Sequence, residues 1–297
     1  MSLIYHKTDV GNIGDDLNEW LWSQFFDLPA VRKDITLIGI GSIISGEKLS
    51  TPAIQLCKKK IFLGSGIRSV STLPKIDNTW DLTFLRGPIS SLFLSNSLDN
   101  YISDGAYALL LSNSYKGILN TPKKHKVSFM PYLRTSSLMP WEKICKRLGI
   151  NYISPHPTNG IEEKLKEIAE SEHLITEAMH GAILADVFRV PWVKLQFASD
   201  LFETGSVNET KWQDWSRSIE VKYSTYKSHQ FPHKISFVPK LYVNYMKLYK
   251  NSIIKNIEKT IELILKEEQY SLSKTNLINT IGQKIDAKIQ TISNRIY

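Results

Sequence analysis

The sequence is poor in cysteine and has no long apolar run. Cys57 and Cys145 are the only cysteines among 297 residues. They are far apart and fit neither a disulfide framework nor a metal-ligand spacing, so we expect a reducing compartment and no metal. No stretch approaches the roughly 18 apolar residues of a membrane span, and the N-terminus lacks the apolar segment of a secretory signal. The sequence therefore predicts a cytoplasmic protein.

The chain also has fewer acidic than basic residues. The chain has 37 Lys and Arg against 29 Asp and Glu, which gives a net charge of +8, and residues 240–297 contain ten basic against five acidic side chains. Such an excess suits phosphorylated substrates or an anionic membrane surface. Because no dense basic block is interleaved with aromatic residues, we expect no nucleic acid as partner.

Strand-like and helical stretches alternate as far as about residue 196, and this order predicts an α/β fold with parallel sheets. We expect two Rossmann-like domains, at residues 1–115 and 122–238, joined by a polar linker and followed by a helical, basic extension at 239–297. The expected strands are residues 3–6, 35–40, 60–63, 80–85, 101–105, 126–130, 151–154, 173–176 and 192–195. The expected helices are residues 17–26, 89–94, 141–148, 161–171, 180–188 and 211–219.

The C-terminal extension begins with a long amphipathic pattern. From Pro239 to about residue 265, apolar side chains recur every three or four positions, which indicates one helical stripe: Met246, Tyr249, Ile253, Ile257, Ile261 and Ile264. Packing across the two domains is the favoured interpretation. Contact of the lysine-bearing face with a membrane surface is the alternative. The residues after Ser271 predict at most a further short helix.

Glycine-containing loops follow the first three predicted strands. In the first loop, Asn12 and Asp15 are candidates to contact an anion or a sugar hydroxyl, and Asp15 or Asp16 is a candidate helix N-cap. The second and third strands end in Gly41-Ser42 and in Gly64-Ser65-Gly66, where small residues let a ligand approach the backbone. For the first loop, a purely structural turn with an N-cap is the alternative.

Three arginines follow predicted strands. Arg86 stands between a strand and a helix, where a guanidinium can bind a carboxylate or phosphate with two parallel hydrogen bonds, although an ion pair is the alternative. Arg68 and Arg134 are weaker candidates on the same grounds. Convergence of several arginines would suit a trianionic ligand.

The stretch from His173 to Asp186 carries the strongest candidate. A strand ends in polar residues, His180 opens a helix, and Gly181 leaves that end uncrowded. His180 could bind a phosphate or exchange a proton, and Glu177 could orient its imidazole. A structural histidine is the alternative. His156 also follows a strand and is a candidate ligand contact, and His6 is a less persuasive one.

Six short motifs, in this order, resemble the polysaccharide pyruvyl transferase family over residues 1 to about 220. The closest branch is that of the succinoglycan pyruvylation proteins. Each motif is weak alone, and their common order makes the signal specific. The motifs are Gly11-Asn12-Ile13-Gly14-Asp15, Gly39-Ile40-Gly41-Ser42, Phe62-Leu63-Gly64-Ser65-Gly66, Phe84-Leu85-Arg86-Gly87-Pro88, Asp104-Gly105-Ala106 and Glu177-Ala178-Met179-His180-Gly181-Ala182.

The resemblance implies a two-domain arrangement like that of GT-B glycosyltransferases, with the donor between the domains. It implies transfer of a pyruvyl unit from phosphoenolpyruvate to a sugar, with no metal and no separate cofactor. Arg86 and His180 match the family positions tied to donor binding, and Asp104 and Gly181 lie in its motifs. Ala178 replaces an arginine of many members, so Arg68, Arg134 or Arg189 would have to substitute for it.

From the chemistry of that reaction we assign candidate roles. Arg86 is the expected carboxylate or phosphate clamp, His180 is a phosphate contact and candidate general acid, and Glu177 or Asp15 would orient the acceptor hydroxyl. The expected acceptor is a lipid-linked oligosaccharide or another glycan, which would place the protein at the inner face of the cytoplasmic membrane. Two alternatives remain at this point: a GT-B glycosyltransferase that uses a nucleotide sugar, and a non-catalytic glycan-binding scaffold at the membrane surface.

Overall fold

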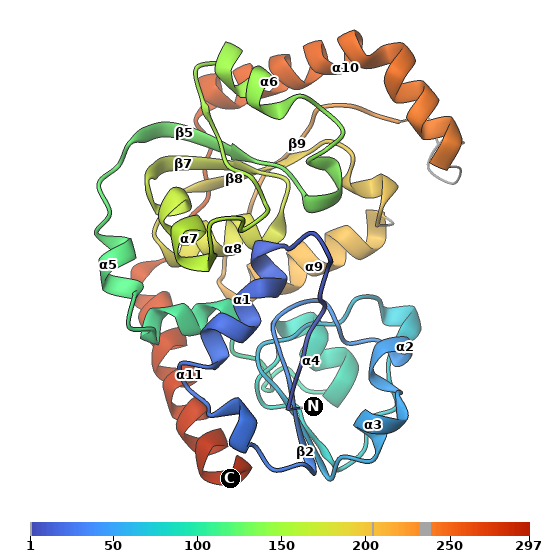
Figure 1. Cartoon of the computed structure of the whole chain (residues 1–297), viewed down its shortest axis with the longest axis vertical. Helices are drawn as coiled ribbons and strands as arrows, with labels where there is room; N and C mark the ends of the chain where they lie inside the picture. Colours follow the sequence, from blue (N-terminus) through green and yellow to red (C-terminus); the bar gives the residue numbers. More distant parts are fainter. Residues whose placement is uncertain (1, 204, 232–238) are drawn as a thin grey trace.

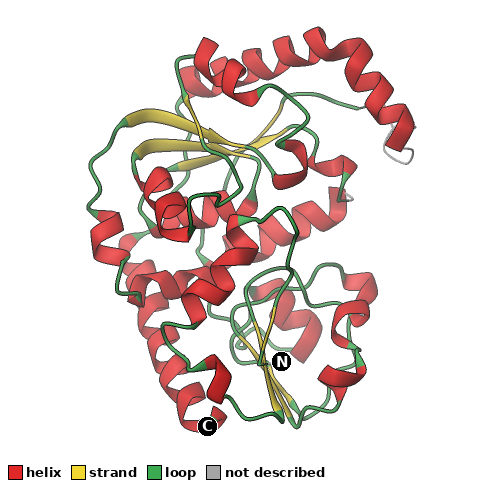
Figure 2. Cartoon of the chain, viewed as in Figure 1, coloured by secondary structure: helices red, strands yellow, loops and turns green. Residues whose placement is uncertain are grey.

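The chain folds into a mixed α/β structure with two parallel sheets, each flanked by helices (Figure 1). It is a computed structural model, and it describes residues 2–203, 205–231 and 239–297. Strands of the first sheet lie in the lower half of the view in Figure 2 and those of the second sheet in the upper half. The predicted α/β class with parallel sheets is confirmed.

The first sheet has the strand order β1-β2-β3-β4 and is parallel throughout. Leu37 and Ile38 of the second strand pair with Leu3 and Ile4 on one side and with Ile61 and Phe62 on the other. Every residue of β2 is buried, as expected for a strand covered on both faces. The strands are β1 (Leu3–Ile4), β2 (Ile35–Ile38), β3 (Lys59–Phe62) and β4 (Trp80–Asp81).

The second sheet has the order β6-β5-β7-β8-β9 and is also parallel. Its strands are β5 (His125–Met130), β6 (Asn151–Tyr152), β7 (Ser171–Thr176), β8 (Trp192–Gln196) and β9 (Thr225–Lys227). The sequence did not predict β9, because a three-residue polar edge strand has no clear pattern. The strand predicted at 101–105 is wrong: Tyr101 makes only a single bridge to Leu85, and Gly105 opens a 3-10 helix.

Helix α1 (Ile13–Trp22) begins earlier than its apolar pattern predicted. Its N-cap residue is Asn12, so the prediction of Asp15 or Asp16 as the cap is wrong. Both carboxylates lie in the first turn instead, where Asp16 accepts the backbone N–H of Asn12 at 3.0 Å. The backbone N–H of Ile13 donates to the Pro155 carbonyl at 3.1 Å, which fixes the start of α1 to the second half of the chain.

The remaining elements connect the strands. The helices up to residue 218 are α2 (Gly46–Leu49), α3 (Pro52–Gln55), α4 (Pro88–Ser95), α5 (Tyr115–Leu119), α6 (Trp141–Arg147), α7 (Ile161–Ala169), α8 (Met179–Val187) and α9 (Gly205–Ser218). The 3-10 helices are η1 (Leu28–Ala30), η2 (Val70–Thr72), η3 (Gly105–Leu111), η4 (Leu133–Thr135) and η5 (Ser199–Leu201). Short helix α5 lies within the stretch that the sequence predicted as a linker.

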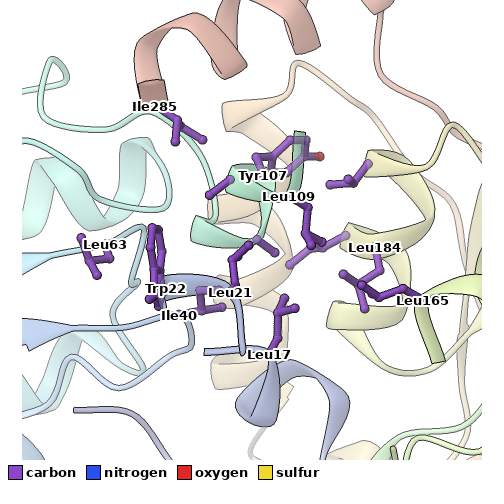
Figure 3. Packing of buried hydrophobic residues seen from close by; sticks show 14 of the residues in the cluster. Leu17, Leu21, Trp22, Ile40, Leu63, Tyr107, Leu109, Leu165, Leu184 and Ile285 are labelled. Carbon is purple, nitrogen blue, oxygen red and sulfur yellow. The ribbon is translucent and has the colours of Figure 1, made fainter. Parts of the chain in front are cut away.

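A single hydrophobic cluster runs from one half of the chain to the other. Leu17 and Leu21 of α1 lie between Ile40, which follows β2, and Leu165 and Leu184 of α7 and α8 (Figure 3). All five side chains are fully buried. The apolar side of α1 therefore joins the two halves.

Helix α9 belongs to the second half by sequence but packs on α4 of the first. Close contact is possible because residue 87 is glycine: a Cβ atom there would lie 1.9 Å from the backbone oxygen of Asp214. The buried ion pair between Arg86, which lies two residues before α4, and Asp214 of α9 stabilises the same contact. Helix α9 therefore bridges the two halves of the chain.

Two long helices complete the chain, α10 (Pro239–Glu267) and α11 (Thr275–Ile296). Ile253, Ile257 and Ile261 of α10 are fully buried in the core of the second half, so these residues pack as predicted, but against the second half alone and not across both halves. The prediction of only a short final helix is wrong, because an isoleucine recurs every three or four residues through α11 and that stripe is buried. No helix among the described residues is long and apolar enough to cross a membrane.

Helix α11 returns to the first half of the chain, along the side of the molecule in Figure 1. Lys288 and Arg295 both form ion pairs with Asp81 at the end of β4, with N–O distances of 3.3 and 3.0 Å. The Arg32 backbone N–H also donates to the Ile296 carbonyl at 2.9 Å. The C-terminal extension thus spans both halves.

Candidate functional site

A cavity of about 140 Å³ lies where the loops of the two halves meet. Segments that follow β1, β2, β3, β5, β7 and β8 contribute to it, together with the start of α1 and one residue each of α2 and α9. This is the end of parallel sheets at which α/β proteins bind ligands. The lining residues are His6, Thr8, Asn12, Asp15, Gly41, Ser42, Ile43, Lys48, Arg68, Tyr132, Leu133, Arg134, Ala178, Met179, His180, Phe202, Glu203 and Lys211.

The structure brings about half of the predicted site residues to this cavity. Those that line it are Asn12, Asp15, Gly41, Ser42, Arg68, Arg134 and His180, together with the weaker candidate His6. Those that do not line it are Ser65, Gly66, Arg86, Asp104, His156, Glu177 and Gly181. A role in ligand contact remains a prediction for every one of them.

Four cationic side chains converge on the cavity: Lys48, Arg68, Arg134 and Lys211. In the part of the chain that the structure describes, the side chains of Arg68 and Arg134 donate no hydrogen bond, and Arg134 lies 5.9 Å from the centre of the Phe202 ring. The sequence analysis missed Lys48 and Lys211. Each is an isolated lysine in a polar stretch, and only the packing of α2 and α9 against the strand ends brings them here.

The charges around the cavity affect one another's protonation. The pKa of His6 is lowered by burial and then by Lys48, Arg134 and Arg68. Burial and the nearby Arg68 also lower the pKa of Lys48, whose Nζ lies 3.2 Å from His6 Nδ1. Lys211 pairs with Glu203, yet burial still lowers its pKa. Four cations against two carboxylates, Asp15 and Glu203, give a site suited to an anion.

His180 reaches the cavity from the first turn of α8. Its Nε2 atom is buried and has no hydrogen-bond partner among the described residues. Desolvation, and to a smaller extent Lys211 and Arg86, lower its pKa to about 3. The imidazole is therefore neutral near pH 7, with one ring nitrogen available to a ligand. Thr8 Oγ1, which also lines the cavity, is a second buried polar atom without a partner in the described chain.

Asp15 is a buried carboxyl group in the cavity wall. Its side chain accepts a hydrogen bond from the Asn12 amide at 2.7 Å, and only 7% of the residue is exposed. Desolvation raises its pKa from 3.8 to about 6, although the Asn12 hydrogen bond lowers it. A carboxyl group with this pKa can release and regain a proton near neutral pH.

The raised pKa of Asp15 makes the folded state less stable as pH rises. Because the unfolded carboxyl ionises near 3.8 and the folded one near 6, stability is lost between these pH values. We expect Asp15→Asn to remove this loss and to stabilise the protein by up to about 3 kcal/mol above pH 7, with the gain vanishing near pH 4. Urea unfolding at several pH values measures the difference. A difference independent of pH would contradict the shift.

Arg86 lies behind the cavity wall and has no exposed surface. Its Nε donates to Asp214 Oδ2 at 3.0 Å, one terminal nitrogen donates to the Ser42 hydroxyl at 2.6 Å, and the other donates to the Ile67 carbonyl at 3.3 Å. The guanidinium thus forms a buried ion pair and supports Ser42, which does line the cavity. This geometry resembles the ion-pair alternative, although in the interior and not on the surface.

Glu177 is also committed to the protein itself. Its Oε1 accepts the backbone N–H groups of Phe197, Ala198 and Ser199 at 2.8 to 3.0 Å. Its Oε2 accepts the hydroxyl of Thr135 and the backbone N–H of residue 132. The carboxylate therefore fixes the loops after β5 and β8, which carry Arg134 and Glu203. None of these hydrogen bonds joins Glu177 to His180, so Glu177 does not orient the imidazole as predicted.

The other predicted residues outside the cavity hold its walls together. His156 Nδ1 lies 3.0 Å from the Val10 and Gly11 carbonyls, so it donates a proton to them and ties the first loop to the second half. Ser65 donates to the Ile38 carbonyl at 2.9 Å. Burial raises the pKa of Asp104 to about 6, and its Oδ2 has no partner in the described residues.

Gly66 and Gly181 are positions of close packing. A Cβ atom at Gly66 would lie 2.1 Å from the Arg86 guanidinium carbon. One at Gly181 would lie 2.5 Å from Thr176 Oγ1, so this end of α8 is crowded and the expectation of an uncrowded end is wrong. Within the described ranges, no three His, Cys, Asp or Glu side chains are grouped to hold a metal ion.

Comparison with known proteins identifies similar sequences. The family model described as polysaccharide pyruvyl transferase matches residues 12–195. The succinoglycan biosynthesis protein ExoV of Rhizobium meliloti (strain 1021) is 32% identical over 228 residues. That alignment covers 75% of this chain and 66% of the relative. The region that the family model matches includes most of the cavity wall, from Asn12 to His180, and ends before α9 and the two C-terminal helices.

Proposed function

Because the chain belongs to the polysaccharide pyruvyl transferase family, we propose that it transfers a pyruvyl group from phosphoenolpyruvate to a sugar of a polysaccharide precursor. The observation that carries the choice of donor is the cavity with four converging cations. Phosphoenolpyruvate has a phosphate and a carboxylate on a three-carbon frame, and its negative charges match those cations. The cavity volume of 140 Å³ is far above the roughly 10–15 Å³ that a single water needs, so the cavity has room for a small anionic molecule.

The donor would be held by the groups that lack partners in the described structure. Arg68 and Arg134 supply guanidinium groups for its phosphate or carboxylate, and either one offsets the alanine at position 178. His180 Nε2 supplies a further contact. An anion bound beside the ring would raise the low pKa of His180, because it would offset the repulsion from Lys211. Arg86 acts here by holding Ser42 in the wall.

The reaction needs a proton at the methylene carbon of the donor. One acceptor hydroxyl adds to the central carbon while the methylene becomes a methyl group, and a second hydroxyl then displaces phosphate to close the cyclic ketal. Asp15, with a pKa of about 6, and His180 in its anion-bound form are the two proton carriers in the cavity. Each gives a proton to carbon or takes one from a hydroxyl. No separate cofactor is needed for these steps.

The arrangement of two parallel sheets with the cavity between their loops is the basis on which we propose a GT-B-like architecture. A cytoplasmic enzyme at the inner membrane face, acting on a lipid-linked oligosaccharide, would meet both substrates. The exposed lysines of α10, such as Lys255 and Lys259, would then lie toward anionic lipid.

Calorimetric titration with phosphoenolpyruvate tests the donor assignment. We expect binding to the wild type and about 10-fold to 100-fold weaker binding to Arg68→Ala and Arg134→Ala, because each variant loses a charge-assisted hydrogen bond. Arg217→Ala is the matched control, since Arg217 is exposed on α9 and outside the cavity. Equal binding by all four proteins would reject the assignment.

The comparison ligand for the same titration is a nucleotide sugar. Binding of the nucleotide sugar without phosphoenolpyruvate would favour a glycosyltransferase, the second candidate on grounds of fold. Binding of neither would favour a glycan-binding scaffold. The proton carriers argue against the scaffold, because a protein that only binds glycan gains nothing from burying an aspartate at a cost in stability.

A further inference from the structure

The surface beside the anion cavity contains a larger groove of about 820 Å³. It lies along β1 and the end of α1, and its wall includes Tyr5, Lys7, Glu19, Gln24 and Phe25. Neither the family model nor the sequence analysis assigns it a role, since most of this wall precedes or lies between the family motifs. We propose that this groove binds uncharged sugar units of a glycan. That the reacting sugar of the same glycan enters the anion cavity rests on the proposed function.

The segment at residues 5–8 separates the two spaces. His6 and Thr8 line the anion cavity, whereas Tyr5 and Lys7 line the groove, so successive side chains alternate between them. One extended segment is therefore the shared wall. A chain of sugars that crosses it would place one unit beside His6 and the next beside Tyr5, because a strand is only about 5 Å wide in the plane of its sheet.

The chemistry of the groove fits neutral sugars. Phe25 and Tyr5 are half-buried and line the groove, and aromatic rings can stack on the C–H side of a pyranose. Lys7 Nζ lies over one face of the Tyr5 ring, 4.9 Å from its centre, so Phe25 is the main stacking residue of the proposal. Glu19 accepts hydrogen bonds from the Tyr5 hydroxyl at 2.8 Å and from Lys7 at 3.1 Å, while its side chain stays 67% exposed. This carboxylate has lone pairs left for sugar hydroxyls.

The charge balance separates the two spaces. In the groove, Lys7 is paired with Glu19, and the remaining charged residue of the wall is Asp27. The groove thus lacks the positive excess of the anion cavity and gives no reason for phosphoenolpyruvate to bind there. The two spaces match the two halves of a substrate pair, an anionic donor and an uncharged glycan.

A peptide is the other ligand that an edge strand can recruit. β1 is at the edge of its sheet, with β2 as its single neighbour. It is only two residues long, however, and offers too few free backbone groups to pair with an added strand. The aromatic and carboxylate side chains favour the glycan.

The test uses oligosaccharides cut from the exopolysaccharide of the strain that encodes this chain, with their ketals removed by mild acid. Calorimetry of the full chain would compare the wild type with Phe25→Ala and Glu19→Gln. We expect about tenfold weaker oligosaccharide binding in each variant and unchanged phosphoenolpyruvate binding. Phe93→Ala is the matched control, because Phe93 is an exposed phenylalanine of α4 outside both spaces. Circular dichroism verifies that each variant folds. If Phe25→Ala does not fold, Glu19→Gln still tests the groove.

The outcomes separate this inference from the proposed function. Oligosaccharide binding that both variants leave unchanged rejects the groove, as does a wild type that binds no oligosaccharide at millimolar concentration. A dimer that Phe25→Ala dissociates in sedimentation, without glycan binding, also rejects it. Failure of the wild type to bind phosphoenolpyruvate rejects the donor assignment alone, because the oligosaccharide titration still decides whether the groove binds glycan.

Discussion

Gly14→Ala is expected to lower pyruvyl transfer by at least about 100-fold. A Cβ atom at position 14 would lie 1.8 Å from Nδ1 of His180, so the imidazole must move out of its place in the cavity. Proton transfer by a positioned side chain contributes about 100-fold to 10,000-fold to a rate, and a displaced His180 would lose that contribution. The misfit should also cost about 1–3 kcal/mol of stability, as overpacking does. Initial rates and urea unfolding measure the two effects.

A double-mutant cycle assigns the cause of that loss. His180→Ala removes the ring that the new methyl group strikes, so Gly14→Ala should cost much less stability in the His180→Ala background than in the wild type. Gly117→Ala is the matched control: Gly117 is in helix α5 with open space at its Cβ position, and alanine there should be neutral or slightly stabilising. Additive effects of the two cavity mutations would contradict the predicted contact.

Asp214→Ala is expected to destabilise the protein by about 3–5 kcal/mol. It leaves the fully buried Arg86 without its counter-ion, and an uncompensated buried charge is among the most costly defects in a protein core. The backbone N–H and hydroxyl of Ser90 lose their acceptor in the same step, at 2.9 and 2.6 Å from the carboxylate. Because Asp214 joins α9 to α4, we also expect Lys211 to lose its place in the cavity. Chemical unfolding and phosphoenolpyruvate titration test both effects.

Glu170→Ala is the control for the ion pair. Glu170 pairs with Lys124, and their side chains are 16% and 59% exposed, whereas those of Asp214 and Arg86 have no exposure. Because Lys124 stays hydrated without its partner, the loss should cost only about 1 kcal/mol. Asp214→Asn serves if the alanine variant does not fold, since it keeps the shape and removes the charge. Arg86→Lys separates a structural arginine from a ligand clamp. If it weakens phosphoenolpyruvate binding while stability stays at the wild-type value, Arg86 contacts the donor and our account of it is wrong.

Much of the fold was predictable because its signals are local. β2 is a short apolar run, β3 and β7 contain the apolar pairs Ile61-Phe62 and Leu174-Ile175, and α8 begins at Met179, one residue before the expected helix start. The wrong or missing predictions concern elements that are stabilised by contacts with distant parts of the chain. α11 has a clear isoleucine stripe, but its other residues are polar, and the sequence therefore predicted only a short helix. The full helix is stabilised by packing on η3 and by ion pairs with Asp81. β9 exists because β8 offers it an edge.

The candidate site divides in the same way. Gly41, Asp15 and His180 were found because each follows a strand, and in a parallel sheet the ends of strands converge. Lys48 and Lys211 follow no such rule, and their positions depend on how α2 and α9 pack. Arg86 and Glu177 were found as polar residues at strand ends, but the sequence could not tell whether their partners would be a ligand or the protein.

By itself the sequence determined most strands of the two parallel sheets, the family to which the chain belongs, and the presence of a histidine at a strand end. Those properties depend on residue order and on short-range periodicity, which any stretch of chain carries alone. The tertiary structure decided which cations meet in one cavity, that Arg86, Glu177 and His156 are already paired, and that residues 5–8 separate the cavity with four cations from the groove without a positive excess. These depend on contacts between residues far apart in the sequence, such as Arg295 with Asp81. Charge and hydrogen bonding act through distance in space, which only the packed chain defines.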